Sequence, residues 1–219
     1  MNHPWLGIPI SDYEAHMALP SVRQAALLAS TLRRVVAAFR PRSLAVLGAA
    51  GGNGLELVDP AIVRRVVAVD FNAEYLAVCA HRHAASFARF EPILHDLSLG
   101  PPAMEPVECA YAGLVLEYVP TGPFYAYLPA LMTGGGIFAA LLQLPSPNLP
   151  EVSPSPFGSL EALGPVFSHV NTDLMHEALT VRGFSRLEEE RIVLDSGKSF
   201  HLAVYRSPDR SRRGLPPDA

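Results

Sequence analysis

A glycine-rich segment and an acidic residue downstream of it are the features of this 219-residue sequence best suited to binding a ligand. In GAAGGNG, residues 48–54, small side chains let the backbone approach a ligand closely and turn into the next helix, whose amide groups point at it. Asp70 ends the following β-branched run, where its carboxylate can accept hydrogen bonds from both hydroxyls of a ribose. Its alternative role is to cap a helix that begins near Ala73, and one carboxylate can do both. The pattern predicts an adenosine site.

The residue after Asp70 and one further strand end extend the predicted site. Phe71 would lie flat beside a nucleobase, although core packing is an equally good role for it. Asp96 is positioned to accept a hydrogen bond from the exocyclic amine of adenine, and Leu97 would present its backbone amide nearby. A lone acid at a strand end is more often a cap or a solvated turn residue. Three such features in the right order favour the binding site.

Alternating strands and helices are expected to position these residues. Residues 11–39 have a broad apolar stripe at helical spacing, with Ser11 and Glu14 at capping-box spacing and Pro41 beyond the end. The expected strands are 43–48, 66–70, 90–96, 109–116, 136–144, 187–195 and 200–206, and the other expected helices are 73–86, 122–132 and 174–184, with a helix and loop over 55–63.

This order predicts an α/β fold, a Rossmann-like three-layer sandwich with a mostly parallel seven-stranded sheet and an antiparallel last strand. Residues 1–40 would form a helical cap segment and 41–206 the binding core. Residues 207–219 have no hydrophobic period and are expected to be a disordered tail.

Composition narrows the class of protein. Hydrophobic residues make up 49% and charged residues 17% of the chain, which is enough apolar material for one large core. The net charge of −4 gives no electrostatic case for nucleic acid or an anionic membrane as a partner. The charge-free stretch 118–150 is interrupted by prolines and glycines, so no membrane span is expected. Two cysteines without metal-ligand spacing and no visible secretory signal favour a cytoplasmic protein, and the scattered histidines predict no metal site.

Five segments together resemble a known family. LAVLGAAGGNGLELV, VVAVDFNAEYLAVC, ILHDLSL, AYAGLVLEYV and GGGIFAALLQLPS are similar to motifs I, post-I, II/III, IV and V of the class I S-adenosylmethionine-dependent methyltransferases, in the family's order. The similarity covers about residues 11–205 and is best for a poorly characterised bacterial group with a YEAHM-like N-terminal segment. It implies that S-adenosylmethionine is the cofactor, S-adenosylhomocysteine the product, and that the cofactor contacts are Gly48, Ala49, Ala50, Gly52, Asp70, Phe71, Asp96, Leu97, Leu114 and Tyr13.

The glycine loop departs from the family pattern at two positions. Ala50 replaces the middle glycine, at little cost if its φ is negative. Val46 stands where an acid would contact the methionine end of the cofactor, and Gln24 or Tyr13 is the expected substitute.

Methyl transfer from a sulfonium is an in-line displacement in which much of the catalysis is positioning, so the resemblance fixes no catalytic residue. Glu117 and Tyr118 follow the fourth strand, where the acceptor lies in the family; Glu117 is a candidate base, with capping or pairing as its alternative role. His16, on the helix expected to cover the site, is the other candidate, although packed or solvated histidines are commoner. The Pro/Ser-rich stretch 145–159 would shape the acceptor pocket or form a lid, and its composition favours a small molecule.

Two other functions fit parts of the pattern. A non-catalytic cofactor binder would explain the changes at Val46 and Ala50. An NAD(P)-dependent reductase is disfavoured, since the short-chain dehydrogenases that have a similar glycine loop need a Tyr-x-x-x-Lys pair. The single lysine, Lys198, has Leu194 four positions before it.

Overall fold

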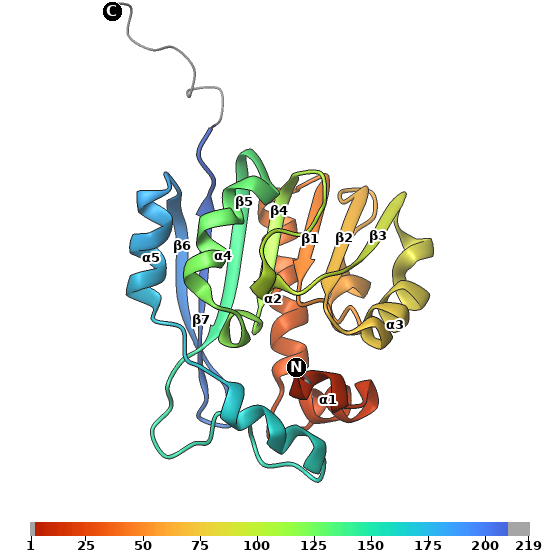
Figure 1. Ribbon diagram of the computed structural model, residues 1–219, viewed down its shortest axis with the longest axis vertical. Helices are drawn as coiled ribbons and strands as arrows, with labels where there is room; N and C mark the ends of the chain where they lie inside the picture. The colour runs from red at the N-terminus through yellow and green to blue at the C-terminus, as the bar shows by residue number, and fades with distance from the viewer. Residues whose placement is uncertain (1–2, 210–219) are drawn as a thin grey trace, which may run out of the picture.

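The computed structural model describes residues 3–209 and contains a seven-stranded sheet in the order β3-β2-β1-β4-β5-β7-β6 (Figure 1). The strands are β1 (Ser43–Leu47), β2 (Arg65–Asp70), β3 (Arg89–Leu94), β4 (Val107–Gly113), β5 (Met132–Gln143), β6 (Ser185–Val193) and β7 (Ser199–Arg206). The first five pair in parallel, and β7 runs antiparallel to both β5 and β6. The predicted Rossmann-like fold is therefore confirmed, with the antiparallel last strand inserted next to β5.

Helices cover both faces of this sheet, which is why its central strands are apolar on both sides. Neighbouring residues on β1 point to opposite faces: Val46 packs with α2 (Gln24–Phe39) and α3 (Ala73–His83), and Leu47 packs with α4 (Thr121–Tyr127) and α5 (Thr172–Val181). All the parallel strands end at the same edge. Figure 1 shows α1 (Ile10–Ala18) and the teal segment after β5 beyond that edge.

The expected helix over 11–39 is two helices. Residues 19–23 separate α1 from α2, and Leu19 is extended (ψ 140°) because Pro20 disfavours a helical conformation in the residue before it. The capping box is also wrong: α1 begins at Ile10, with Pro9 at the N-cap position, so Ser11 lies inside the helix.

The helix expected after the glycine loop is absent from the structure. Only a single 3-10 turn, η2 (Leu55–Leu57), lies between β1 and β2. At Gly54 (φ +94°) an added Cβ would be 2.9 Å from the Cα of Ala29, so α2 occupies the space beside the loop. The loop therefore lacks an α-helix whose N-terminus could point at a ligand.

The remaining differences are at element ends. The helix expected over 122–132 continues as the 3-10 helix η6 (Leu128–Leu131), and the one over 73–86 ends as η3 (Ala84–Ser86). Two predicted strands end earlier than expected. Asp96 is the N-cap residue of η4 (Leu97–Leu99), and Leu116 is the first residue of η5 (Leu116–Tyr118). Part of the Pro/Ser-rich loop leads into η7 (Gly158–Val166).

The predicted tail begins too early. Ser207 is 5% exposed, its amide donates to the carbonyl of Gly136 (2.7 Å), and its hydroxyl donates to the carbonyl of Thr133 (2.7 Å). Residues 210–219, the rest of the predicted tail, lie outside the described residues.

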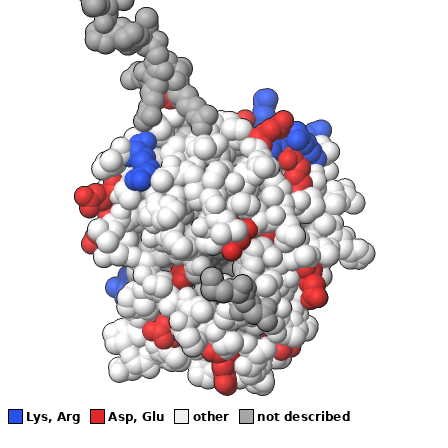
Figure 2. All heavy atoms as spheres, in the orientation of Figure 1, with Lys and Arg blue, Asp and Glu red and all other residues white. Residues whose placement is uncertain are grey.

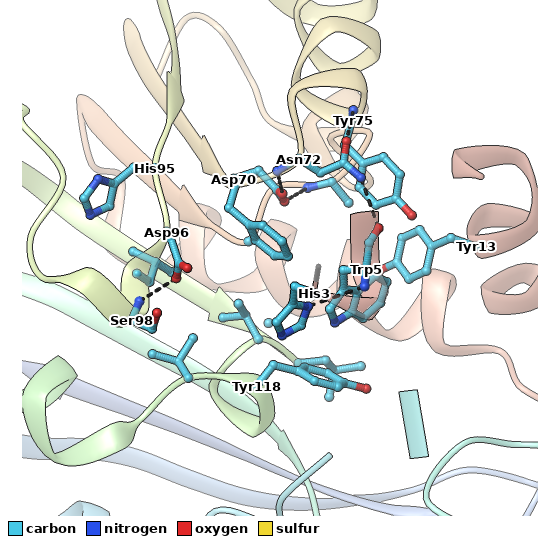
Figure 3. Close-up of a pocket in the computed structure, with 18 residues that line it drawn as sticks. His3, Trp5, Tyr13, Asp70, Asn72, Tyr75, His95, Asp96, Ser98 and Tyr118 are labelled. Carbon is cyan, nitrogen blue, oxygen red and sulfur yellow. Dashed lines mark hydrogen bonds between the residues drawn. The ribbon is translucent and has the colours of Figure 1, made fainter. Parts of the chain in front are cut away.

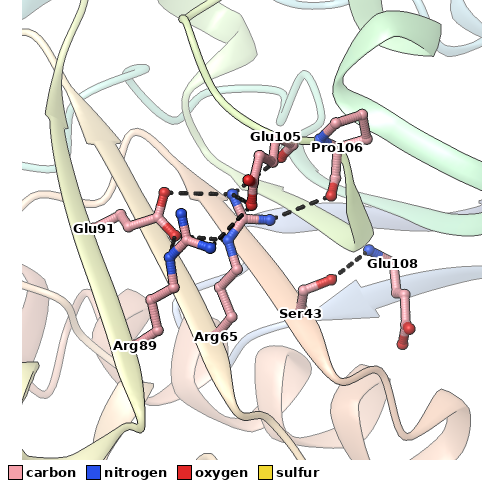
Figure 4. Close-up of polar contacts among 7 residues, drawn as sticks. All are labelled: Ser43, Arg65, Arg89, Glu91, Glu105, Pro106 and Glu108. Carbon is pink, nitrogen blue, oxygen red and sulfur yellow. Dashed lines mark hydrogen bonds and ion pairs between the residues drawn. The ribbon is translucent and has the colours of Figure 1, made fainter.

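An ion network ties the starts of two strands to the segment before β4 (Figure 4). The guanidinium of Arg65 pairs with the carboxylate of Glu91 (2.6 Å) and donates to the carbonyls of Glu105 and Pro106, and Arg89 pairs with both acids. Figure 2 shows basic and acidic side chains close together at the upper right margin of the molecule, with the other charged groups scattered over the face.

Within residues 3–209, no helix is long and apolar enough to span a membrane. In the same range, no cluster of three or more metal-ligating side chains is found. Cys79 and Cys109 are free thiols in the core.

Candidate functional site

A pocket opens at the edge of the sheet where the parallel strands end (Figure 3). Its lining comes from the N-terminal segment, the glycine loop and the ends of β2, β3 and β4. The predicted cofactor residues that line it are Gly48, Ala50, Asp70, Phe71, Asp96, Leu97, Leu114 and Tyr13. Ala49 and Gly52 do not, because both are buried in the loop.

Asp70 is held at the floor of the pocket by backbone amides. One carboxylate oxygen accepts from the amide of Ala50 and the other from the amide of Asn72, each at 2.9 Å. Burial raises the pKa of this carboxyl, and hydrogen bonds from the backbone oppose the rise. Asp70 does not cap α3, since the side chain of Asn72 accepts from the amides of Glu74 and Tyr75. A carboxylate has about four acceptor positions, and those that the backbone amides do not use can accept from a ligand.

The adenine-binding candidates lie around the same space. Phe71 is half-buried and meets the ring of His3 edge to face, with centroids 5.0 Å apart. Asp96 accepts from the amide of Ser98 (2.8 Å) as the N-cap of η4, so its expected capping role is present. Leu97 is buried at 5% exposure beneath them.

The glycine loop is left-handed at several positions. Gly48 has φ +71°, and a Cβ there would be 2.5 Å from the side chain of Val115. Ala50 has φ +44°, so the alanine is strained by about 1–2 kcal/mol, contrary to the expectation of a negative φ. In this conformation the backbone amide of Ala50 donates a hydrogen bond to the carboxylate of Asp70, which stabilises it. Gly52 (φ +84°) packs against α3, where a Cβ would approach Cys79 within 2.8 Å.

Of the two expected substitutes for the missing loop acid, only Tyr13 reaches this pocket. Val46 is 6% exposed in the core. The amide of Gln24 donates to the side chain of Gln143 (3.4 Å) and faces a different pocket. Tyr13 lines both pockets and stacks near Tyr75 with centroids 6.1 Å apart.

A second pocket adjoins the first. Both are lined by Trp5, Tyr13, Leu114 and Tyr118. The predicted catalytic residues Glu117 and His16 line only the second pocket.

Glu117 is 1% exposed, and only one of its two carboxylate oxygens has a hydrogen-bond partner among the described residues. One carboxylate oxygen accepts from the amide of Gln143 (2.7 Å), and the other, Oε2, has no partner among the described residues. Burial raises the pKa of this carboxyl to about 7. A carboxyl with a pKa near neutrality can exchange protons during a reaction.

His16 is 4% exposed, and its Nδ1 also has no partner among the described residues. Burial, and then the charge of Lys198, lowers its pKa. The ammonium of Lys198 donates to the carbonyl of Glu151 (2.6 Å) and lies 3.5 Å from the side-chain oxygen of Gln143. Histidine is therefore neutral here near pH 7.

Sequence reasoning missed several lining residues. Trp5 is placed by its carbonyl, which accepts from the side chain of Asn72 (3.1 Å), and Tyr75 donates to the carbonyl of Ile8 (2.8 Å). The place of Asn72 could have been predicted, because asparagine directly before the start of a helix is a preferred N-cap. The places of Trp5 and Tyr75 could not, since only the folded chain brings the N-terminal segment to α3.

No family model matches the sequence, and no curated protein matches it. Many solved structures match its fold. The N-methyltransferase NodS from Bradyrhizobium japonicum WM9, in complex with S-adenosylhomocysteine, superposes with a TM-score of 0.63 at 13% identity, covering 85% of this chain and 88% of that one. A Burkholderia thailandensis 1,6-didemethyltoxoflavin-N1-methyltransferase gives 0.60 at 16% identity, covering 84% and 78%. The [4+2]-cyclase SpnF gives 0.62 at 13% identity, covering 82% and 81%.

At these identities the likeness concerns the fold, and a cyclase among the neighbours shows that the fold alone does not fix the reaction. The chain has the Rossmann-like fold of the class I S-adenosylmethionine-dependent methyltransferases.

Proposed function

We propose that this protein is an S-adenosylmethionine-dependent methyltransferase that acts on a small molecule. The observation that carries the proposal is Asp70, a buried carboxylate fixed by two backbone amides at the floor of a pocket that continues into a second one. Structural neighbours crystallised with S-adenosylhomocysteine support the same cofactor here.

The residues present fit an adenosine group. Asp70 keeps acceptor positions for two ribose hydroxyls, and Phe71 and Leu97 provide apolar surface for a base. Asp96 would accept from the exocyclic amine. Gly48 lies at the pocket floor beside the side chain of Val115, so a side chain in place of the glycine would fill space in the pocket. The methionine end has no acid on β1, so Tyr13 is the residue proposed to contact it.

The bound cofactor would supply an activated methyl group. The chain would bind the acceptor in the second pocket, exclude water with the N-terminal segment and η7, and hold the reacting atoms in line. Those two segments share a small apolar cluster, with Ile8 against Leu160 and Leu163, and the hydroxyl of Ser159 donates to Asp12 (2.7 Å). Glu117 would act as the base and Tyr118 would line the passage between the pockets.

Calorimetric titration with S-adenosylmethionine, S-adenosylhomocysteine and NAD(H) tests the proposal. Saturable binding of the two sulfur compounds is expected; binding of the nicotinamide alone would refute it and favour the reductase. Asp70→Ala should weaken S-adenosylhomocysteine binding at least about tenfold.

Because Asp70 also holds Ala50 and Asn72, the variant must be shown to be folded. Asp70→Asn is the matched variant, since it keeps the shape of the side chain and an acceptor oxygen for one of the two amides. Urea unfolding of both variants separates lost stability from lost binding. An unchanged affinity in folded Asp70→Ala would remove Asp70 from the proposed site.

The second candidate is a cofactor-binding protein without turnover, motivated by the buried Val46 in place of an acid and the strained Ala50. Formation of S-adenosylhomocysteine with any pool of small acceptors distinguishes the two. We also propose a cytoplasmic location, in which the free, buried Cys79 and Cys109 stay reduced.

A further inference from the structure

Two residues that line the second pocket each have a buried side-chain atom without a partner among the described residues. Glu117 Oε2 and His16 Nδ1 come from different parts of the chain, η5 and α1, and both side chains are less than 5% exposed. Buried polar atoms are almost always hydrogen-bonded, because an unsatisfied one costs about 1–3 kcal/mol. Two such atoms in one pocket indicate a ligand with complementary groups.

The charge of the pocket is one-sided. Of the described residues that line it, none is a lysine or an arginine. The nearby Lys198 is turned to the carbonyl of Glu151 and the side chain of Gln143, and His16 is neutral near pH 7 because its pKa is lowered. The side chain of Glu151 is half exposed and lies at the outer rim. Among the described residues that line this pocket, Glu117 is therefore the one buried carboxyl, and the nearest lysine, Lys198, lies beyond Gln143.

The walls are aromatic. The ring of Trp5 meets Tyr118 edge to face at 5.3 Å and Tyr13 at 5.4 Å, and Tyr118 meets Phe167 at 5.7 Å. Aromatic rings around a buried carboxylate favour a ligand with an apolar body and a positively charged head.

We propose that the methyl acceptor is a small amine, held with its nitrogen against Glu117 Oε2; this inference rests on the proposed methyl transfer. A carboxylate acceptor would be repelled by Glu117, and a phenolate would find no cation to stabilise it. An alkylammonium supplies the missing counter-charge and the donors that Glu117 Oε2 and His16 Nδ1 lack.

The reaction balances without any other reactant. The ammonium gives a proton to the Glu117 carboxylate and becomes a neutral amine. The nitrogen lone pair then forms the N–C bond as the S–C bond of the sulfonium breaks, which leaves a methylated ammonium, a neutral thioether and a protonated Glu117. That proton leaves to solvent with the product. A carboxyl whose pKa is about 7 takes a proton from an ammonium more readily than an ordinary carboxyl does.

The test uses matched small probes on the full chain saturated with S-adenosylhomocysteine. Benzylamine, benzyl alcohol and benzoate, followed by their phenylethyl homologues, are titrated by calorimetry. The amines are expected to bind at least tenfold more tightly than the alcohols, and the carboxylates least. This preference should disappear in Glu117→Gln and persist in Glu188→Gln, which makes the same change on the exposed face of β6.

A second measurement needs no variant. At pH 7, amine binding should release about half a proton, since the ammonium drives the remaining protonated Glu117 to ionise, whereas alcohol binding should release none. Titrations in two buffers of different ionisation enthalpy measure it. The other titratable groups around Glu117 are common to both probes. They are Tyr13, His16, Tyr118, Tyr125, Glu151 and, beyond Gln143, Lys198.

The outcomes separate the two proposals. Equal or better binding of the alcohols, no binding of any probe, or an amine preference that survives Glu117→Gln would overturn the amine acceptor. Failure of S-adenosylhomocysteine to bind would overturn the cofactor instead. An amine preference in its absence would leave the amine site standing.

Discussion

As the pH rises, the Glu117→Gln variant should become more stable relative to the wild-type protein. Raising a carboxyl pKa from 4.5 to about 7 corresponds to about 3 kcal/mol, at about 1.4 kcal/mol per pKa unit. Because the folded-state pKa is the higher one, the stability from protonated Glu117 is fully present below about pH 4.5 and is lost as the pH rises through 7. Glutamine keeps the acceptor for the amide of Gln143 and does not ionise.

Most of the change falls between pH 5 and pH 8. Over that range the free energy of unfolding of the wild type should drop by about 2.5 kcal/mol relative to that of the variant. With a typical urea dependence, this moves the difference between their midpoints by about 1 M. Effects of the substitution that do not depend on pH, such as that of the new buried N–H group, shift the stability difference equally at every pH. They therefore do not affect how that difference changes with pH.

Urea titrations at half-unit pH steps, followed by circular dichroism, provide the assay. Glu188→Gln is the control, since that side chain is exposed on β6, and its difference from wild type should not vary with pH. If the Glu117→Gln and wild-type stabilities ran parallel from pH 5 to pH 8, the buried carboxyl would not be the near-neutral group described here.

Two further substitutions test the fold around the site. Gly52→Ala should destabilise the protein by about 2 kcal/mol or more, because φ is +84° and the new Cβ would meet α3 side chains at 2.6–2.8 Å; Gly122→Ala, with nothing within 4 Å, should be neutral or slightly stabilising in thermal unfolding. Arg65→Met should cost about 2–3 kcal/mol, because it removes a guanidinium that is only 12% exposed together with its hydrogen bonds to Glu91 and to the carbonyls of Glu105 and Pro106. Arg89→Met, at a side chain 54% exposed, should cost under about 0.5 kcal/mol, and equal effects of the two substitutions in urea unfolding would contradict this difference.

The succession of strands and helices, and with it the mostly parallel sheet, could be predicted because the first strands are short runs followed closely by Gly48, Asp70 and Asp96. The crossover after β1 could not. Its helix is replaced by a single turn, since α2 lies against the loop at Gly54, and that contact joins segments distant in sequence. The capping box failed for a similar reason: the carboxylate of Glu14 pairs with Arg82 of α3 instead of turning back to the start of its own helix.

Much of the site was predictable because strand ends meet at one edge of a parallel sheet. Asp70 and Asp96 follow from that rule alone. Trp5 and Gln143 do not, because their places depend on how the N-terminal segment and the chain after β5 fold over the edge. The positive φ of Ala50 could not be predicted from the sequence either, since it accompanies a hydrogen bond from the Ala50 amide to the carboxylate of Asp70, 20 residues away.

Glu117 links stability to the proposed function. A glutamine in its place would serve the backbone equally well, so the fold has no need for a carboxylate there. The ionised side chain, with one oxygen unpaired, makes the folded chain less stable above pH 7 than a neutral one would. A group that opposes folding and faces a pocket shared with the proposed cofactor site is best accounted for by a ligand. If Glu117→Gln raised stability at pH 8 and left amine binding intact, the residue would have neither a structural nor a binding role, and this reasoning would fail.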